Sequence, residues 1–157
     1  MTAAIVQLLA SPAHRFEGRP IDGPAPAPPG EVVTEAHIRA GLGIVGDRYY
    51  AKQAHRDAAV TLIAQESLPP GIDLTHVRRN ILTTGIAVDD LVGRTLCLDS
   101  GAGQVCLEVR RPANPCAWMD VTIAPGAWRT LRGRGGIRCV PLNDGILVPG
   151  PVTVEIR

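Results

Sequence analysis

The residue with the clearest capacity for chemistry is Cys116, which follows a predicted strand and two arginines. Between residues 104 and 110, apolar and polar side chains alternate with the period of two that is typical of a half-buried strand. Pro112 ends the ladder because it has no N–H, and Asn114-Pro115 predicts a kink before the cysteine. A thiol on such a turn, near cationic side chains, can act as a nucleophile, a sulfur carrier or a metal ligand. A buried structural cysteine is the alternative.

A second group of polar residues, Arg78-Arg79-Asn80, precedes a short apolar run. Arginine offers a planar pair of donors that matches phosphate or carboxylate, and asparagine both donates and accepts. On a strand or bend, Arg78 and Asn80 would point to one face and Arg79 to the other. Arg78 and Asn80 are therefore candidates for holding an anionic group. A solvated arginine pair beside a turn asparagine is the alternative.

Three glycines in six residues, at 41, 43 and 46, predict a sharp bend in the chain. The spacing Gly-x-Gly-x-x-Gly also occurs in dinucleotide sites, but no helix with an apolar stripe follows it here. We therefore interpret the segment as a bend. The polar residues on either side of it, His37 before and Asp47 after, are candidates for the wall of a site.

Composition limits the classes of function. The chain has 157 residues and is 45% hydrophobic, which is enough for one domain with a core. The net charge of +1 provides no overall field that would attract nucleic acid or a membrane surface. No apolar run reaches the ~18 residues of a membrane span, and no basic segment precedes the apolar N-terminus as in a secretory signal. We therefore expect a cytoplasmic protein that binds neither nucleic acid nor membranes.

The four cysteines, at 97, 106, 116 and 139, include no Cys-x-x-Cys pair, so a zinc knuckle or a thioredoxin-type motif is not indicated. Cys97 and Cys106 would face each other across a hairpin that turns at residues 100–103. Because cytoplasmic thiols are usually reduced, we expect these two side chains to pack together without a disulfide.

The order of apolar runs, glycines and prolines predicts many short strands and few helices, which favours a closed barrel or a sandwich. Residues 1–30, a strand and a proline-rich loop, are expected to belong to the same domain as residues 31–157. The expected strands cover residues 3–10, 31–40, 57–64, 94–99, 104–110, 137–142, 146–148 and 152–157. Short helical turns are expected at 65–68, 87–92 and 125–131.

Taken in order, six segments resemble the MOSC family, named for the C-terminal domain of molybdenum-cofactor sulfurase. They read GLGIVGD (41–47), AAVTLIAQES (58–67), RRNILTTGI (78–86), LVGRTLCL (91–98), CLEVRRPANPCAWMD (106–120) and GGIRCVPLNDGILVPGPV (135–152). The resemblance covers most of the chain from residue 31 onward. One departure is Pro149-Gly150-Pro151, which stands where the family often has Gly-Asp.

The resemblance implies a mostly β, MOSC-like barrel with a few short helices and identifies Cys116 as the characteristic cysteine of the family. It implies that Cys116 ligates molybdenum in a bound molybdenum cofactor (molybdopterin), or carries sulfur as a persulfide. Arg78 and Asn80 would hold the pterin and phosphate end of the cofactor, and Asp47 and His37 are the further residues expected to bind it. Some members of the family reduce N-hydroxylated compounds.

Three functions therefore follow as hypotheses. The chain is a molybdenum-dependent oxidoreductase acting on a small N-hydroxylated molecule, a sulfurtransferase-like carrier with a Cys116 persulfide, or a non-catalytic barrel that binds a small anion or a partner. We expect no bound pyridoxal phosphate. Electrons or sulfur would come from a separate protein, an external electron donor in the first case and a cysteine desulfurase in the second.

Overall fold

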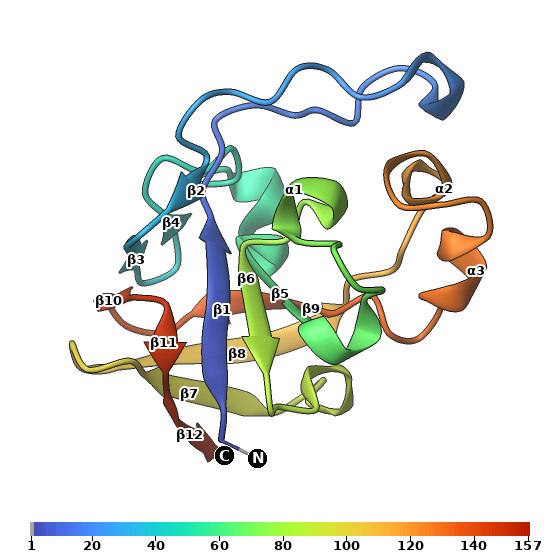
Figure 1. Cartoon of the computed structure of the whole chain (residues 1–157). Helices are drawn as coiled ribbons and strands as arrows, with labels where there is room; N and C mark the ends of the chain where they lie inside the picture. The colour runs from blue at the N-terminus through green and yellow to red at the C-terminus, as the bar shows by residue number, and fades with distance from the viewer. Residues whose placement is uncertain (1) are drawn as a thin grey trace.

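The computed structural model describes residues 2–157 and consists mainly of strands joined by short turns (Figure 1). The strands are β1 (Ala4–Leu9), β2 (Val32–Val33), β3 (Ala36–Arg39), β4 (Gly43–Ile44), β5 (Val60–Ala64), β6 (Ile81–Thr84), β7 (Thr95–Asp99), β8 (Gln104–Pro112), β9 (Ile137–Pro141), β10 (Gly145–Leu147), β11 (Gly150–Pro151) and β12 (Thr153–Ile156). The α-helices are α1 (Leu74–Val77), α2 (Trp118–Thr122) and α3 (Ala127–Thr130), and the 3₁₀ helices are η1 (Pro20–Asp22), η2 (Gln53–Ala58), η3 (Gln65–Ser67) and η4 (Val88–Asp90). The expected mostly β class is confirmed. Among residues 2–157, no helix is long and apolar enough to cross a membrane.

The strands form an open nine-stranded sheet and a separate three-stranded sheet. The large sheet has the order β11-β1-β6-β5-β9-β8-β7-β12, with β2 also paired to β1, and the small sheet has the order β10-β3-β4. All pairs are antiparallel except β5 with β6. Among the described residues, the edge strands β11 and β12 do not pair with each other, so the expected closed barrel is not found. The edge strand β11 has only two residues, one of them a proline that cannot donate to a ladder.

Two apolar clusters cover the two faces of the central strands. Leu8, Leu62 and Ile81 belong to the main core, while the adjacent Leu9 and Ile63 pack in a second core beneath the helices. Successive residues of a strand point to opposite faces, so both faces of these strands are apolar. All five residues of β5 are buried, which explains why this strand reads as a continuous apolar run.

The proline-rich segment between β1 and β2, residues 11–30, folds back on the domain as an arm. In Figure 1 it crosses the top of the molecule and reaches the region of α2, and η1 in this arm contacts α2. Its beginning is held where Ser11 N–H donates to Asp47 Oδ1 at 3.2 Å, and Arg48 N–H donates to the Ser11 carbonyl at 2.7 Å. The arm therefore lies beside the turn that follows β4.

Candidate functional site

Cys116 lies at a cavity of about 110 Å³ that is formed by segments from most of the chain. Four arginines line this cavity, and no aspartate or glutamate does. The lining residues, which define the Cys116 cavity, are Phe16, Arg48, Tyr49, Ala58, Thr61, Val77, Arg78, Arg79, Ala113, Cys116, Met119 and Arg138. A thiol among cationic groups suits an anionic ligand that also bonds to sulfur.

Cys116 is exposed and stands on the loop between β8 and α2. The loop is fixed at its start, where Ala113 N–H donates to the Gly136 carbonyl at 2.8 Å. Gly135 allows this close approach, because a side chain there would collide with the Ala113 carbonyl and the Pro115 ring. Local packing therefore presents the thiol on a defined loop.

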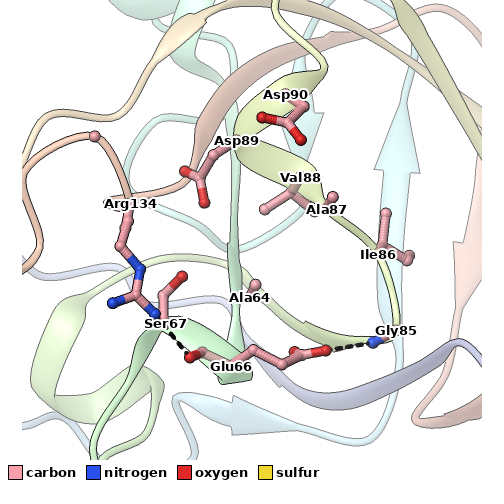
Figure 2. A pocket seen from close by; sticks show the side chains of 11 residues that line it. Ala64, Glu66, Ser67, Gly85, Ile86, Ala87, Val88, Asp89, Asp90 and Arg134 are labelled. Carbon is pink, nitrogen blue, oxygen red and sulfur yellow. Dashed lines mark hydrogen bonds between the residues drawn. The ribbon is translucent and has the colours of Figure 1, made fainter. Parts of the chain in front are cut away.

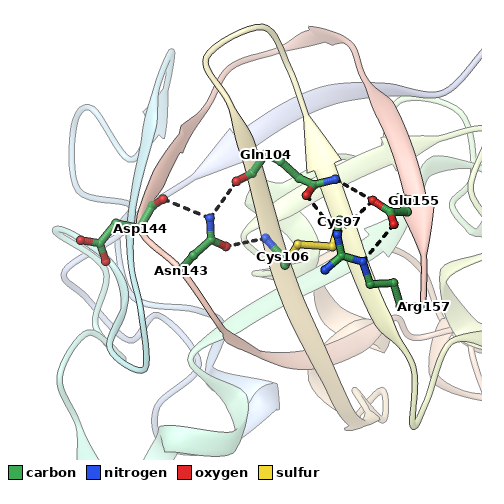
Figure 3. Close-up of a disulfide and its surroundings, with 7 residues drawn as sticks. All are labelled: Cys97, Gln104, Cys106, Asn143, Asp144, Glu155 and Arg157. Carbon is green, nitrogen blue, oxygen red and sulfur yellow. Dashed lines mark hydrogen bonds and ion pairs between the residues drawn. A yellow bond between two sulfur atoms is a disulfide. The ribbon is translucent and has the colours of Figure 1, made fainter.

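The other three cysteines are in different chemical states. Cys139 is fully buried in β9, and burial raises the pKa of its thiol far above the ordinary range. Cys97 and Cys106 form a disulfide between β7 and β8, as Figure 3 shows. The expectation that they pack as reduced thiols is wrong, because the hairpin places them directly opposite each other. Within residues 2–157, Cys116 is thus the one cysteine that is both free and exposed.

Arg79 is held in the cavity by backbone carbonyls alone. Its guanidinium donates to the carbonyls of Gly135 (3.0 Å), Val77 (3.0 Å) and Ala113 (3.2 Å). Burial, followed by the nearby charge of Arg138, lowers the pKa of Arg79 to about 10. The side chain is therefore still cationic at neutral pH, and no carboxylate in the described chain pairs with it.

Arg48 is nearly buried, with 8% of its side chain exposed. Its Nη2 donates to the Arg78 carbonyl at 3.3 Å, but its Nη1 is buried without a hydrogen-bond partner. Asp47 Oδ1 lies 3.6 Å from Nη1, which is close enough for an ion pair and too far for a good hydrogen bond. The guanidinium carbon also lies 4.6 Å from the centroid of the Tyr49 ring.

Arg78 reaches the cavity because it ends α1 in the left-handed conformation, with φ of 60°. Its Nη1 donates to Glu31 Oε1 at 2.7 Å and its Nη2 to the Ala13 carbonyl at 3.3 Å. The expectation that Arg78 and Asn80 share a face opposite Arg79 is wrong. Both arginines line the cavity, and Asn80 does not, because the left-handed residue interrupts the alternation of an extended strand.

Asn80 is buried below the cavity, where its amide makes four hydrogen bonds. Its Oδ1 accepts from Thr61 N–H (2.9 Å) and Thr61 Oγ1 (3.0 Å), and its Nδ2 donates to the Leu9 carbonyl (3.1 Å) and to Asp47 Oδ1 (3.1 Å). These four bonds satisfy both N–H donors and both acceptor positions of the amide. Asn80 therefore supports the site by holding Asp47 in place.

The remaining two candidates lie outside the Cys116 cavity. Asp47 is buried, and its Oδ2 accepts from Tyr49 N–H at 3.2 Å, so it orients the turn that carries Arg48. His37 lies on β3 in the small sheet, is half-exposed, and contacts Glu35 Oε2 at 3.0 Å. The structure therefore brings Cys116 together with Arg78 and places Asp47 and Asn80 behind them, while His37 lies apart.

The site residues predicted from the sequence did not include Arg48, Arg79 or Arg138. Arg138 is half-buried on β9, and its guanidinium has no hydrogen bond or ion pair among residues 2–157. A lone arginine inside an otherwise apolar strand was the available signal, because arginine is rarely buried unless it is paired. The direction in which the Arg138 side chain points depends on the pairing of β9 with β5 and β8.

A larger cavity, of about 460 Å³, lies elsewhere, between η3, η4 and the loop before β9 (Figure 2). Two of its charged residues, Glu66 and Arg134, already have protein partners. The Glu66 carboxylate accepts from Gly85 N–H at 2.7 Å, and the Arg134 guanidinium donates to the Glu66 carbonyl at 2.9 Å. It contains neither a thiol nor an unpaired buried cation, so the smaller Cys116 cavity is the better candidate site.

No protein family and no curated protein matches the sequence. Solved structures match the fold. YuaD from Bacillus subtilis has a TM-score of 0.72 at 18% identity, over 99% of this chain and 96% of that one. YiiM from Geobacillus stearothermophilus has a TM-score of 0.62 at 17% identity, over 98% of this chain and 75% of that one. YiiM from Escherichia coli has a TM-score of 0.56 at 15% identity, over 98% of this chain and 70% of that one. These MOSC-type neighbours support the MOSC-like fold expected from the sequence.

Proposed function

We propose that this protein binds the molybdenum cofactor at the Cys116 cavity and reduces small N-hydroxylated compounds there. The observation that carries the proposal is the exposed Cys116 thiol on a cavity lined by four arginines and no carboxylate. The MOSC-like fold of YuaD and YiiM supports it. A separate electron donor would supply the two electrons that, with two protons, convert an N-hydroxyl compound to the amine and water.

The side chains fit the metal and the phosphate of this cofactor, and its remaining atoms would extend beyond a cavity of about 110 Å³. The terminal phosphate of the cofactor is anionic, and Arg79 and Arg138 are cationic donors without a carboxylate partner among residues 2–157. Charge-assisted hydrogen bonds from such groups contribute about 1.5–3 kcal/mol each. Arg79 and Arg138 would hold the phosphate end, and the Cys116 thiolate would be a metal ligand. When bound, the cofactor supplies a redox-active metal that accepts soft sulfur ligands.

The test is the metal and pterin content of protein from a host that makes the cofactor. We expect both molybdenum, by mass spectrometry, and pterin, by fluorescence after oxidation, in the wild-type protein. Cys116→Ser should remove the metal ligand, and Arg79→Gln should lower both contents by about tenfold, since it removes a charge-assisted contact. Arg132→Gln, an exposed arginine outside the cavity, is the matched control and should match the wild type.

Wild-type protein that contains neither molybdenum nor pterin would contradict the proposal. So would a Cys116→Ser variant that keeps its full content of both and reduces an N-hydroxylated substrate at the wild-type rate.

A second function, persulfide transfer, is favoured by the exposure of Cys116 on its loop. A sulfur carrier needs an accessible thiolate that a partner protein can approach. After incubation with a cysteine desulfurase and free cysteine, intact-mass spectrometry should show one added sulfur atom that Cys116→Ser abolishes. An added sulfur on Cys139 would contradict this assignment, since that residue is buried.

A further inference from the structure

A second cavity, of about 120 Å³, adjoins the Cys116 cavity on the side of the arm. We call it the arm cavity, and it is lined by His14, Arg15, Phe16, Arg48, Tyr49 and Arg78. Four of these six residues also line the Cys116 cavity, so the two spaces share a wall. Pockets for drug-sized molecules usually measure about 300–1,000 Å³, so the arm cavity suits one small functional group.

The walls of the arm cavity carry more positive than negative charge. Arg78 is neutralised by Glu31 at 2.7 Å, and both of these side chains are about 95% buried. Arg15 has no carboxylate partner, because its Nε donates to the Ala25 carbonyl (2.7 Å) and its Nη1 to the Thr75 carbonyl (3.3 Å). No aspartate or glutamate lines the cavity. An anion placed here would therefore meet guanidinium groups, while the carboxylates of Glu31 and Asp47, which pair with Arg78 and Arg48, are not among the lining residues.

Arg48 independently indicates that the arm cavity can bind a group that accepts hydrogen bonds. Its side chain is more than nine-tenths buried, and its Nη1 has no hydrogen-bond partner in the described part of the chain, residues 2–157. The nearest carboxylate oxygen, Asp47 Oδ1, already accepts from Ser11 N–H and from Asn80 Nδ2. Leaving a buried donor unsatisfied costs about 1–3 kcal/mol, and more for a charged group. An oxyanion in the arm cavity would supply the acceptor that the protein lacks.

We propose that the arm cavity binds an oxyanionic group of the substrate, a phosphate or carboxylate, while the rest of that molecule extends into the Cys116 cavity. This inference rests on the proposed function, because it names the class of substrate that the site would take. Arg15 and Arg48 contribute charge-assisted donors, and His14 contributes a ring nitrogen. The shared wall of the two cavities places the anionic group beside the cavity in which the reaction would occur.

Inorganic phosphate is the probe, and isothermal titration calorimetry at neutral pH is the measurement. Protein prepared with and without the cofactor should bind one phosphate with similar affinity. Arg15→Gln and Arg48→Gln should each weaken binding by about tenfold or more, the change expected for one charge-assisted hydrogen bond. Arg19→Gln is the matched control, because this arginine is on the same arm, 80% of its side chain is exposed, and it lies outside both cavities.

His14 provides a second measurement, which can report the bound anion in the wild-type protein itself. Burial, and then the charge of Arg48, lower the pKa of His14 below its ordinary value, while Glu17 and Asp47 oppose this shift and His55 adds to it. A bound oxyanion should raise the pKa of His14, which NMR titration of the ring protons can follow. In Arg15→Gln, where the oxyanion binds weakly, the same concentration of phosphate should leave the pKa of His14 nearly unchanged.

Three outcomes would overturn the inference. They are wild-type protein that binds no phosphate, an Arg19→Gln variant that loses as much affinity as Arg15→Gln, and cofactor-loaded protein that no longer binds phosphate. The third outcome would mean that the phosphate of the cofactor itself occupies the arm cavity. Failure of the proposed function gives a different result. If the protein contains no molybdenum or pterin but still binds phosphate in an Arg15-dependent way, the oxyanion site stands and the proposed chemistry does not.

Discussion

Asn80, a single buried amide, holds three parts of the chain together beneath the two cavities. It bonds the end of β1 through the Leu9 carbonyl, the start of β5 through Thr61, and the turn after β4 through Asp47. Asp47 in turn accepts from Tyr49 N–H and lies beside Arg48. A residue that touches no ligand can thus determine where the cationic residues of a site are placed. Polar groups used in this way are buried and fully bonded.

At the same scale, Asp89 gives a prediction on pH. Its Oδ1 accepts from Gly136 N–H at 2.9 Å, and burial, followed by the charge of Asp90, raises its pKa. A raised pKa means that the folded state binds this proton more tightly than the unfolded state does. The free-energy cost of the ionised carboxylate therefore grows as the pH rises from the ordinary aspartate pKa to the raised pKa, is complete above the raised pKa, and disappears below the ordinary aspartate range.

We expect Asp89→Asn to raise the free energy of unfolding at pH 7 by up to about 1 kcal/mol, because the amide oxygen can still accept from Gly136. At pH 3.5, where both states of the wild type are largely protonated, the difference should vanish, as measured by urea unfolding at the two pH values. Asp22→Asn, on the exposed arm tip, is the control and should show no such difference. A variant less stable than the wild type at pH 7 would contradict the sign.

At the scale of elements, the disulfide joins β7 and β8 at a place where their backbones do not bond to each other. Cys106 N–H donates to Asn143 Oδ1 at 2.8 Å, and its carbonyl accepts from Leu142 N–H at 2.8 Å, so both groups point away from β7 (Figure 3). In antiparallel pairs, such non-hydrogen-bonded positions bring side chains closest together. The sulfur bridge thus adds a covalent link at a non-hydrogen-bonded pair.

Reduction of this disulfide should lower the free energy of unfolding by about 2–3 kcal/mol, as expected for a short closed loop. The two cysteines are nine residues apart in sequence. Urea unfolding with and without dithiothreitol measures the effect, and the double variant Cys97→Ala/Cys106→Ala should be insensitive to the reductant. Equal midpoints for oxidised and reduced wild-type protein would show that the bridge does not contribute to stability.

At the scale of the whole molecule, the arm connects the N-terminal third of the chain to the loop that carries the thiol. Phe16 stacks on Trp118, two residues beyond Cys116, with ring centroids 5.0 Å apart and planes 8° apart. Phe16 also lines both cavities. Access to the thiol therefore depends on Phe16, a residue 100 positions before Cys116 in the sequence.

Phe16→Ala should increase the rate at which Cys116 reacts with a thiol reagent, because it removes one wall of the cavity and one anchor of the arm. We expect severalfold faster alkylation, and a loss of stability of about 1–3 kcal/mol from the aromatic pair and the buried area. Ile21→Ala is the control, since Ile21 lies on the same arm with 84% of its surface exposed. An unchanged rate in Phe16→Ala would mean that the arm does not limit access to Cys116.

The sequence by itself determined most of the elements and the candidate thiol. Alternation of apolar residues predicted β8 and the hairpin with β7, and the kink at Asn114-Pro115 correctly placed Cys116 on a loop after the strand. These features depend on neighbouring residues, whose periodicity and backbone preferences are visible locally.

Only the tertiary structure decided which arginines meet the thiol. The left-handed conformation of Arg78 brings Arg79 to the same cavity, and the pairing of β9 brings Arg138 there from the other end of the chain. The open sheet and the disulfide likewise follow from which strands pair and in what register. Such contacts join residues far apart in sequence, and the pattern of any one segment does not contain the position of its partner.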